Sequence, residues 1–250
     1  MLTEERHRII LQLIKERSIV KIQDLVDITN TSESTIRRDL TQLEEAKYLK
    51  RIHGGAARLL GKLQEASMNE KSSKNLQQKK RIAQFAAEFI EEGDCIYLDA
   101  GSTVKEMLPF LPKKKIVVVT NGLMHVPFLL EQQIPTYLIG GYAKPKTNAL
   151  IGSSALSGLE IYRFDKCFMG VNGIHQQFGY TTPDPEEAMV KQLALSLSRE
   201  AFVLADDSKF SEIAFAKIAD LHEAAIITNE LNPEIKEQYG TITKIKVVTA

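Results

Sequence analysis

The chain has 250 residues, of which 44% are hydrophobic, and its 32 basic residues balance 32 acidic ones. This composition suits a folded protein of one large domain or two smaller ones and argues against wholesale disorder. No apolar stretch approaches the roughly 20 residues of a membrane helix, and the charged opening MLTEERHRII does not resemble a signal peptide. We therefore expect a cytoplasmic protein without membrane partners.

The zero net charge hides an asymmetry. Residues 1–81 carry 17 Lys and Arg against 11 Asp and Glu, whereas residues 82–250 carry 15 against 21. A positive excess in one part of a chain indicates an anionic partner there, although ordinary surface variation leaves the same trace. Cys95 and Cys167 stand far apart in apolar runs, so we expect core residues rather than a metal or redox pair.

Three helices followed by a hairpin are predicted near the start of the chain. Apolar residues at helical spacing indicate helices over 3–17, 21–29 and 32–45. The two glycines in YLKRIHGGAARL then indicate a hairpin. This order is typical of a winged helix-turn-helix domain, here expected over 1–60, whose third helix reads base edges in the major groove of DNA.

The third helix and the hairpin carry groups that suit DNA. Hydroxyl groups bond phosphates or base edges, and arginine can form two hydrogen bonds with guanine. Two adjacent arginines are by themselves more often a solvated helix face, but their place in a complete reader favours DNA contact. The residues expected to bind DNA are Ser32, Ser34, Thr35, Arg37, Arg38, Arg51, His53 and Gly54.

The rest of the chain predicts a second domain. Residues 61–78 are polar without a clear period and are interpreted as a linker. A helix over 79–91 and seven short apolar runs separated by helical or polar segments indicate a doubly wound α/β domain over 79–250, with a parallel sheet covered on both faces. The runs lie at 95–99, 116–120, 136–140, 165–170, 201–205, 224–228 and 244–248.

Several of these expected strands end in small or polar residues. Ligands of open α/β sheets bind beyond the carboxyl ends of the strands, and a glycine turn that opens a helix offers backbone N–H groups to an anion. One such end is more often a plain turn, but the set favours an effector site, with a lysine as a point charge for phosphate. Its expected residues are Asp99, Gly101, Ser102, Thr103, Thr120, Asn121, Gly140, Gly141, Asn172, Gly173, Thr181, Glu187 and Lys209.

The stretch SESTIRRDLTQLEEAKYLKRIHGGA resembles the signature of the DeoR family of bacterial transcriptional repressors. In the second domain, segments similar to the family's D-x-G-S-T, T-N, G-G, G-x-T and D-x-S-K-F recur in the family's order. The resemblance implies Arg37 and Arg38 as the main DNA contacts, while Asp39 is expected to orient an arginine or to bond within its helix. It also implies a sensor fold similar to ribose-phosphate isomerases and a phosphorylated sugar as effector.

Within that family, the opening residues and KIQDL…SESTIRRDL look most like repressors of fructose-utilisation operons, which implies fructose 1-phosphate as effector. We expect a repressor that binds double-stranded operator DNA as a homodimer or homotetramer and is released by this sugar phosphate. No metal, cofactor or catalytic residue is expected.

Two other functions are open at this point. A phosphosugar isomerase with a DNA-binding appendage needs a base beside the carbonyl, but 169–173 has no acid where the related isomerases are acid-rich. Asp184, Glu186 and Glu187 stand nearby and leave weak activity open. An architectural DNA binder that senses nothing would leave the polar strand ends unexplained. The sequence therefore favours a regulator over an enzyme.

Overall fold

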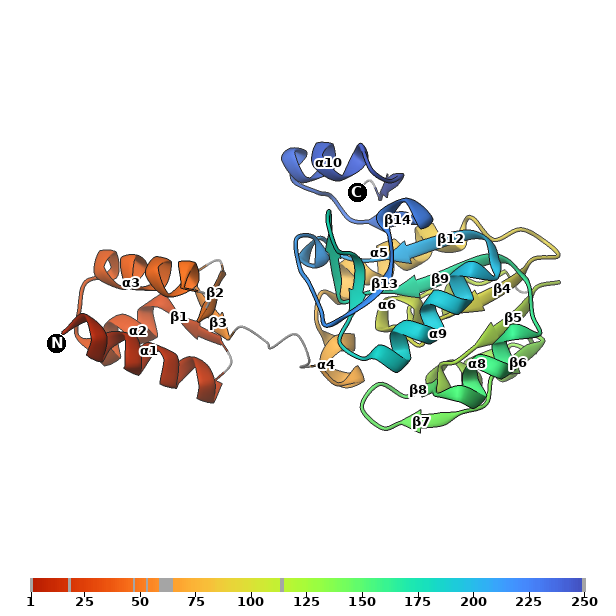
Figure 1. The fold of residues 1–250 in the computed structure, drawn as a ribbon, viewed down its shortest axis with the longest axis horizontal. Helices are drawn as coiled ribbons and strands as arrows, with labels where there is room; N and C mark the ends of the chain where they lie inside the picture. The colour runs from red at the N-terminus through yellow and green to blue at the C-terminus, as the bar shows by residue number, and fades with distance from the viewer. Residues whose placement is uncertain are drawn as a thin grey trace. The chain divides into compact units, whose positions relative to one another are not determined.

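The computed structural model describes residues 2–17, 19–46, 48–52, 54–58, 65–112 and 115–248. The chain divides into two compact units, residues 1–61 and 62–250, each with its own apolar core. Figure 1 labels their helices and strands. In these described ranges, no helix is long and apolar enough to cross a bilayer.

The N-terminal unit packs three helices against a small antiparallel sheet. Its described elements are α1 (Thr3–Arg17), β1 (Ile19–Lys21), α2 (Ile22–Thr29), α3 (Glu33–Glu45), β2 (Leu49–Ile52) and β3 (Gly55–Arg58). The strand order β1-β3-β2 places β3 in the middle. The core is built from apolar residues at helical spacing, such as Ile10, Leu25 and Leu40. The predicted winged helix-turn-helix is therefore present, with β1 as an additional strand.

Two glycines shape the turn between β2 and β3. Gly54 has a φ of 77°, in the left-handed region that glycine adopts at little cost. Gly55 pairs with Lys21 of β1, and a Cβ on Gly55 would lie 2.2 Å from the carbonyl oxygen of Val20. The backbone of the wing therefore favours glycine at position 54 and requires it at position 55.

The C-terminal unit is built on a seven-stranded parallel sheet with the order β15-β14-β12-β9-β4-β5-β6. The strands are β4 (Cys95–Leu98), β5 (Val117–Thr120), β6 (Thr136–Leu138), β9 (Phe164–Gly170), β12 (Ser198–Leu204), β14 (Ala225–Thr228) and β15 (Ile245–Val247). Each overlaps one of the apolar runs seen in the sequence. From β4, the chain adds β5 and β6 on one side and β9, β12, β14 and β15 on the other, which confirms the doubly wound prediction. The topological switch point therefore lies at the carboxyl ends of β4 and β9.

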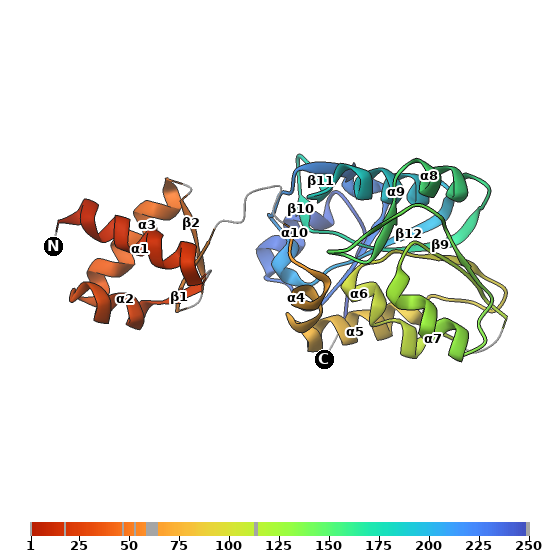
Figure 2. The same cartoon turned by 90° about the horizontal axis from the view of Figure 1, so that it is seen from below.

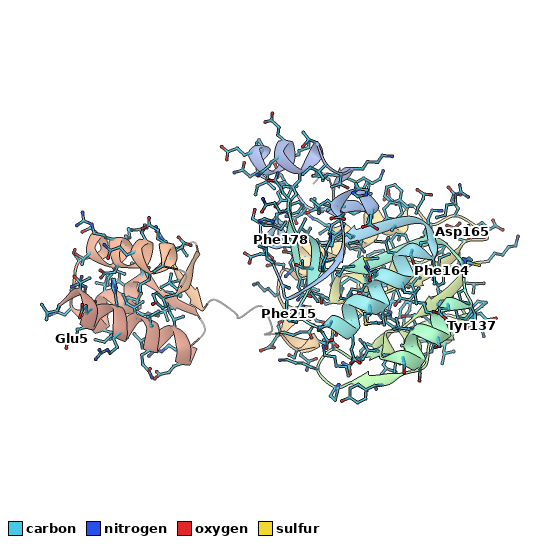
Figure 3. All side chains as sticks on the ribbon, viewed as in Figure 1. Glu5, Tyr137, Phe164, Asp165, Phe178 and Phe215 are labelled. Atoms are coloured by element: carbon cyan, nitrogen blue, oxygen red, sulfur yellow. The ribbon has the colours of Figure 1, made fainter. Side chains whose placement is uncertain are left out.

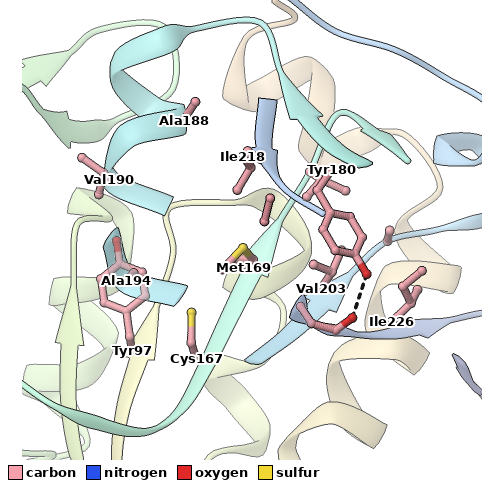
Figure 4. Close-up of a cluster of buried hydrophobic side chains, with 14 of the residues drawn as sticks. Tyr97, Cys167, Met169, Tyr180, Ala188, Val190, Ala194, Val203, Ile218 and Ile226 are labelled. Atoms are coloured by element: carbon pink, nitrogen blue, oxygen red, sulfur yellow. Dashed lines mark hydrogen bonds between the residues drawn. The ribbon is translucent and has the colours of Figure 1, made fainter. Parts of the chain in front are cut away.

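Helices cover both faces of this sheet, as Figure 2 shows, with α8 and α9 on one side and α5 and α7 on the other. The helices of the unit, besides short 3-10 turns, are α4 (Met68–Ser73), α5 (Leu76–Ala87), α6 (Ser102–Lys105), α7 (Val126–Glu131), α8 (Ser153–Glu160), α9 (Pro185–Ser196) and α10 (Pro233–Gly240). Along β4 the side chains alternate: Ile96 and Leu98 pack with α5, whereas Tyr97 packs with α9. Figure 4 shows the second of these two cores.

Two smaller sheets extend this unit. One is the hairpin of β7 (Tyr142–Lys144) and β8 (Ala149–Ile151), and the other pairs β10 (Gly173–His175), β11 (Gly179–Thr182) and β13 (Ala216–Ala219). The sequence did not predict them, because strands of three or four residues carry too little alternation. Some large apolar side chains remain exposed, among them Tyr137 on β6 and Phe215 just before β13 (Figure 3).

The expected linker over 61–78 differs from the structure. Residues 61–64 lie outside the described residues, but 65–78 contain α4 and the start of α5. Ser67 and Glu70 form a capping box at the start of α4, and Met68 is buried. This S-x-x-E signal was overlooked because the segment lacks a helical period.

Candidate functional site

The first two turns of α3 present polar side chains on the surface of the N-terminal unit. Ser34, Arg37 and Arg38 are exposed and Thr35 is half-buried. Ser32 caps the helix by accepting a hydrogen bond from the Thr35 N–H at 3.3 Å, and its Oγ lies 3.0 Å from the Ser34 Oγ. The structure therefore gathers these five predicted DNA-binding residues at one end of α3.

The two adjacent arginines have different surroundings. Arg37 forms an exposed ion pair with Glu33, with 2.5 Å between a guanidinium nitrogen and Oε1, and such surface pairs stabilise little. Arg38 instead lines a polar hollow of about 360 Å³. Its lining residues are Thr3, Arg6, Ser34, Thr35, Arg38, Asp39 and Gln42.

Asp39 is turned inward and joins α3 to α1. Its carboxylate is buried and accepts two hydrogen bonds from Arg6, at 2.7 and 3.0 Å. The Nε2 atom of His7 lies 3.2 Å from the same carboxylate. As expected, Asp39 orients an arginine, and that arginine comes from another helix.

The wing residues are placed less clearly for DNA. Arg51 is half-buried, and its guanidinium donates to Thr41 Oγ1 at 3.0 Å, which directs it along α3. Gly54 lies at the exposed tip of the turn, where its carbonyl accepts a hydrogen bond from the Ile22 N–H. His53, the remaining predicted residue, lies outside the described residues.

In the C-terminal unit, polar groups meet at the switch point of the sheet. The buried carboxylate of Asp99, just after β4, accepts hydrogen bonds from the Gly170 N–H at 3.0 Å and from Lys191 Nζ at 2.5 Å. A Cβ on Gly101 would lie 3.1 Å from this carboxylate and 3.3 Å from the Gly170 Cα. Glycine therefore gives the chain room to pass between the ends of β4 and β9 and begin α6, where a Cβ would push its neighbours by a few tenths of an ångström.

A buried lysine lies beside the start of α6. Lys79 on α5 is 4% exposed, and its ammonium group donates to Ser102 Oγ at 3.1 Å and to the Lys71 carbonyl oxygen. Burial lowers the pKa of Lys79 to about 8; Asp206 opposes this shift and Lys209 adds to it. We call Lys79, Asp99, Ser102, Lys191 and Asp206 the strand-end cluster.

Asp206, after β12, fixes the neighbouring loops. Its Oδ1 accepts hydrogen bonds from Asn75 Nδ2 at 2.9 Å and from the hydroxyl of Ser208 at 2.5 Å. Burial opposes ionisation, but Lys209 and the hydrogen bonds of Ser208 and Asn75 hold the pKa of Asp206 below its usual value. Lys79 thus connects the predicted residues Ser102 and Lys209, because it donates to Ser102 and its pKa is lowered in part by the charge of Lys209.

Other predicted effector residues have their polar atoms engaged within the fold. The Thr120 hydroxyl donates to the Leu98 carbonyl at 2.6 Å and accepts from the Gly122 N–H at 3.0 Å. Since that hydroxyl has one hydrogen, the neighbouring His125 Nδ1, at 3.0 Å, is the donor to it. Asn121 accepts from the Ala100 N–H at 3.0 Å and holds the loop after β4.

The glycines farther along the chain also meet structural requirements. Gly141 has a φ of 125°, and a Cβ there would lie 2.5 Å from the Ile151 carbonyl oxygen, while Gly140 is open and exposed. A Cβ on Gly173 would lie 2.4 Å from the Glu212 carbonyl oxygen. Gly141 and Gly173 thus allow close backbone approach, and the structure joins none of the three glycines to the strand-end cluster.

Asn172 and Thr181 belong to the small sheet around β10 and β11. The Thr181 hydroxyl accepts from the Ala214 N–H at 2.9 Å, and Asn172 Oδ1 accepts from Thr182 at 3.2 Å. The Asn172 N–H also donates to the Thr181 carbonyl. Both side chains hold this sheet together.

Glu187 belongs to a second group of charges, which we call the Lys144 network. The Lys144 ammonium lies 2.9 Å from Glu187, 2.6 Å from Asp184 and 2.5 Å from Glu65. These three carboxylates are near enough to one another to hold a metal ion, but the ammonium lies among them and supplies the positive charge. Burial opposes it, but hydrogen bonds to the three carboxylates raise the pKa of Lys144 above its usual value.

Sequence reasoning missed Lys79, Lys144 and Glu65 and gave Lys191 no role. One signal was available for Lys79, because it precedes Ile82 and Ala83 by a helical turn and so lies on the buried face of α5. A lysine on such a face needs partners. The others act through pairings between distant segments, which spacing along the chain does not reveal.

Comparison with known proteins gives matches over both units. Residues 6–60 match the DeoR-like helix-turn-helix domain, and residues 74–230 match the DeoR C terminal sensor domain. The uncharacterized HTH-type transcriptional regulator FruR of Bacillus subtilis is 52% identical over 249 residues, 99% of either chain. The lactose phosphotransferase system repressor of Staphylococcus epidermidis is 33% identical, over 94% of this chain and 96% of its own.

Among solved structures, ribose 5 phosphate isomerase A from Neisseria gonorrhoeae aligns with a TM-score of 0.40 and 21% identity, over 54% of this chain and 53% of that chain. The relatives that match over nearly their whole length are transcriptional regulators, so the chain is a regulator rather than an enzyme. With matching domains in both units, the chain belongs to the DeoR family of transcriptional regulators.

Proposed function

We propose that this protein represses a sugar-utilisation operon and is released from its operator by a phosphorylated sugar, fructose 1-phosphate. The names of its relatives support a sugar-related role, since one is FruR and another a repressor of a lactose phosphotransferase system. The operator is double-stranded DNA, and a homodimer or homotetramer supplies two readers for two half-sites.

The surface of α3 supports the DNA-binding half of this proposal. Ser34, Thr35 and Arg38 share the wall of one polar hollow, and Arg37 stands exposed beside them. These side chains form the surface that enters the major groove, with Ser32 at the helix N-terminus near the DNA backbone. Arg51, His53 and Gly54 of the wing contact the backbone of the same site.

One observation carries the effector half: the buried ammonium of Lys79 lies beside Ser102 at the switch point of the sheet. Lysine is a compact cation that suits phosphate. In its described hydrogen bonds the buried ammonium donates only to neutral oxygens, Ser102 Oγ and the Lys71 carbonyl. Gly101 and Thr103 flank Ser102, and Lys209 adds a second positive charge nearby. We place the phosphate group here.

The remaining predicted effector residues are assigned supporting roles. Asp99 fixes Lys191 within the cluster and Glu187 fixes Lys144, whereas Thr120 and Asn121 fix the loops after β4 and β5. Gly141 and Gly173 allow close backbone approach, Thr181 holds the small sheet of β10, β11 and β13, and Gly140 lies open and exposed in the loop after β6. Asn172, half-buried between β9 and β10, is assigned to the sugar.

Release of the protein from its operator then follows from a difference in the affinity of the effector for two arrangements of the protein. Operator DNA and sugar phosphate favour different arrangements of the protein, and the effector weakens DNA binding by its preference for one of them, typically about 1–3 kcal/mol. Fluorescence anisotropy of the protein's own promoter DNA at fixed salt, titrated with sugar phosphates, tests this. We expect release by fructose 1-phosphate and not by fructose 6-phosphate, glycerol 3-phosphate, tagatose 6-phosphate or ribose 5-phosphate.

Matched variants separate the two halves. Arg37→Ala should weaken operator binding by about 1–3 kcal/mol while keeping the effector response. Lys209→Ala should keep DNA affinity but blunt release. Absence of DNA binding at low salt would refute the N-terminal assignment, and indifference to every sugar phosphate would refute the effector.

A further inference from the structure

We propose that residues 65–73, here called the strap, couple effector binding to the DNA-binding unit, and that the Glu65–Lys144 ion pair holds this coupling. The inference rests on the proposed function and assigns its regulation. The strap contains α4 and is the first described segment after Arg58. Any signal that passes along the chain from the effector site to the N-terminal unit passes through it.

The strap is fixed to the C-terminal unit by buried polar contacts. The Met68 N–H donates to the Lys146 carbonyl at 2.9 Å. Glu65 lies 2.5 Å from Lys144, outside the strap, and 2.6 Å from Lys71, within it, and its side chain is only 5% exposed. Separating a buried ion pair leaves an uncompensated charge and is strongly destabilising. These contacts therefore hold the strap against the hairpin of β7 and β8.

One route from the effector site to the strap is direct. The ammonium of Lys79 donates both to Ser102 at the proposed phosphate site and to the carbonyl of Lys71 in the strap. A charged phosphate oxygen is a stronger acceptor than a neutral carbonyl. A lysine ammonium has three N–H donors, so phosphate beside Ser102 can bind the same ammonium that holds the strap and draw it away from the Lys71 carbonyl.

A second route runs through α9. Lys191 pairs with Asp99 in the strand-end cluster, and Glu187 pairs with Lys144. Since Glu187 and Lys191 are four residues apart, they lie on one face of the helix. A movement of α9 that shifts Lys191 therefore also moves the carboxylate of Glu187, which shares Lys144 with Glu65. Both routes converge on the strap.

Glu65→Gln isolates the strap contact. In this variant Lys144 keeps Asp184 and Glu187 as partners, and Lys71, whose side chain is 21% exposed, can turn to water. No buried ammonium loses all its partners, so the variant should fold. Asp94→Asn is the matched control, because Asp94 forms a similarly buried 2.7 Å pair with Lys166 at the amino end of β4, away from the strap.

The test uses the full chain and measures how much each ligand, effector or operator, changes the affinity for the other. Affinity for fructose 1-phosphate is measured by calorimetry on free and on operator-bound protein, and operator affinity is measured with and without fructose 1-phosphate. By linkage both ratios equal one coupling factor, typically about 5–150. We expect Glu65→Gln to keep the affinity of the free protein for each partner within about threefold while its coupling factor falls to about 2.

Asp94→Asn should lower the unfolding temperature but keep the wild-type coupling factor, and Glu65→Asp should restore part of it. A wild-type coupling factor in Glu65→Gln, or equal losses in Glu65→Gln and Asp94→Asn, would overturn the role of the strap while leaving the proposed function intact. Wild-type protein that ignores fructose 1-phosphate would overturn both.

Discussion

The proposed role of Lys79 makes effector binding depend on pH. Its pKa is lowered to about 8, mainly by burial, whereas a sugar phosphate is already largely a dianion at pH 7. Above pH 8 the lysine loses its charge and its attraction for phosphate. We expect affinity for fructose 1-phosphate to fall roughly tenfold between pH 7 and pH 9, measured by calorimetry. Lys79→Met should bind weakly at both pH values, and an equal decline in that variant would assign the pH effect elsewhere.

His125 makes stability depend on pH on the acid side. It is fully buried, and burial lowers its pKa to about 4, so the unfolded chain takes up a proton first as the pH falls. The stability that this neutral ring contributes is present above pH 6.5 and lost towards pH 4. Between pH 7 and pH 5 the loss should be roughly 2 kcal/mol. Urea unfolding at the two values checks it, and His125→Asn should show a smaller loss.

At the residue scale, the sequence predicted the polar residues at strand ends but not their partners. Asp99 and Ser102 follow an apolar run directly, so their place at the edge of the sheet could be derived from the chain order. Lys191 reaches Asp99 across 92 positions, and Glu65 reaches Lys144 across 79. Such pairings depend on tertiary packing. Likewise Thr120 has the residue type of a ligand-binding group, yet its hydroxyl is used within the fold.

At the element scale, prediction succeeded where a period or an apolar run was long enough. All seven strands of the parallel sheet and the three N-terminal helices follow from such patterns. The three-residue strand β1 has no pattern of its own and is specified by its pairing with β3. Helix α4 has only a capping box as its signal. Short elements are thus set by their neighbours.

The wing offers a test of this dependence. Gly55→Ala places a Cβ against the Val20 carbonyl and should destabilise the N-terminal unit by roughly 1–3 kcal/mol. Gly54→Asn is the matched control, because nothing lies within 4 Å of its Cβ position and asparagine tolerates a positive φ at a cost of about 1 kcal/mol. Calorimetric unfolding of the full chain checks both. Equal losses of stability in the two variants would show that the backbone conformation of the turn, rather than the close approach of β1, determines the stability of the wing.

At the scale of the whole molecule, the charge asymmetry of the sequence follows the two units only in part, because residues 1–61 carry 11 Lys and Arg against 9 Asp and Glu. The positive excess of residues 1–81 includes the arginines of α3, while most acidic residues belong to the sheet domain. The basic part also includes Lys71 and Lys79, which lie in the C-terminal unit. Most of the positive excess therefore lies in residues 62–81, at the start of the C-terminal unit, and charge along the chain does not mark the boundary between the two units.

A single N-terminal unit presents one α3, which can occupy one segment of major groove. Operator recognition over two half-sites about 34–36 Å apart therefore needs at least two copies. We expect sedimentation of the full chain with operator DNA to give two or four copies per duplex, and a duplex cut to one half-site to bind far more weakly. Arg38→Ala, which alters α3 alone, should lower affinity without changing this stoichiometry. A single copy bound tightly to the intact operator would contradict the paired arrangement, because one α3 would then provide all of the specificity.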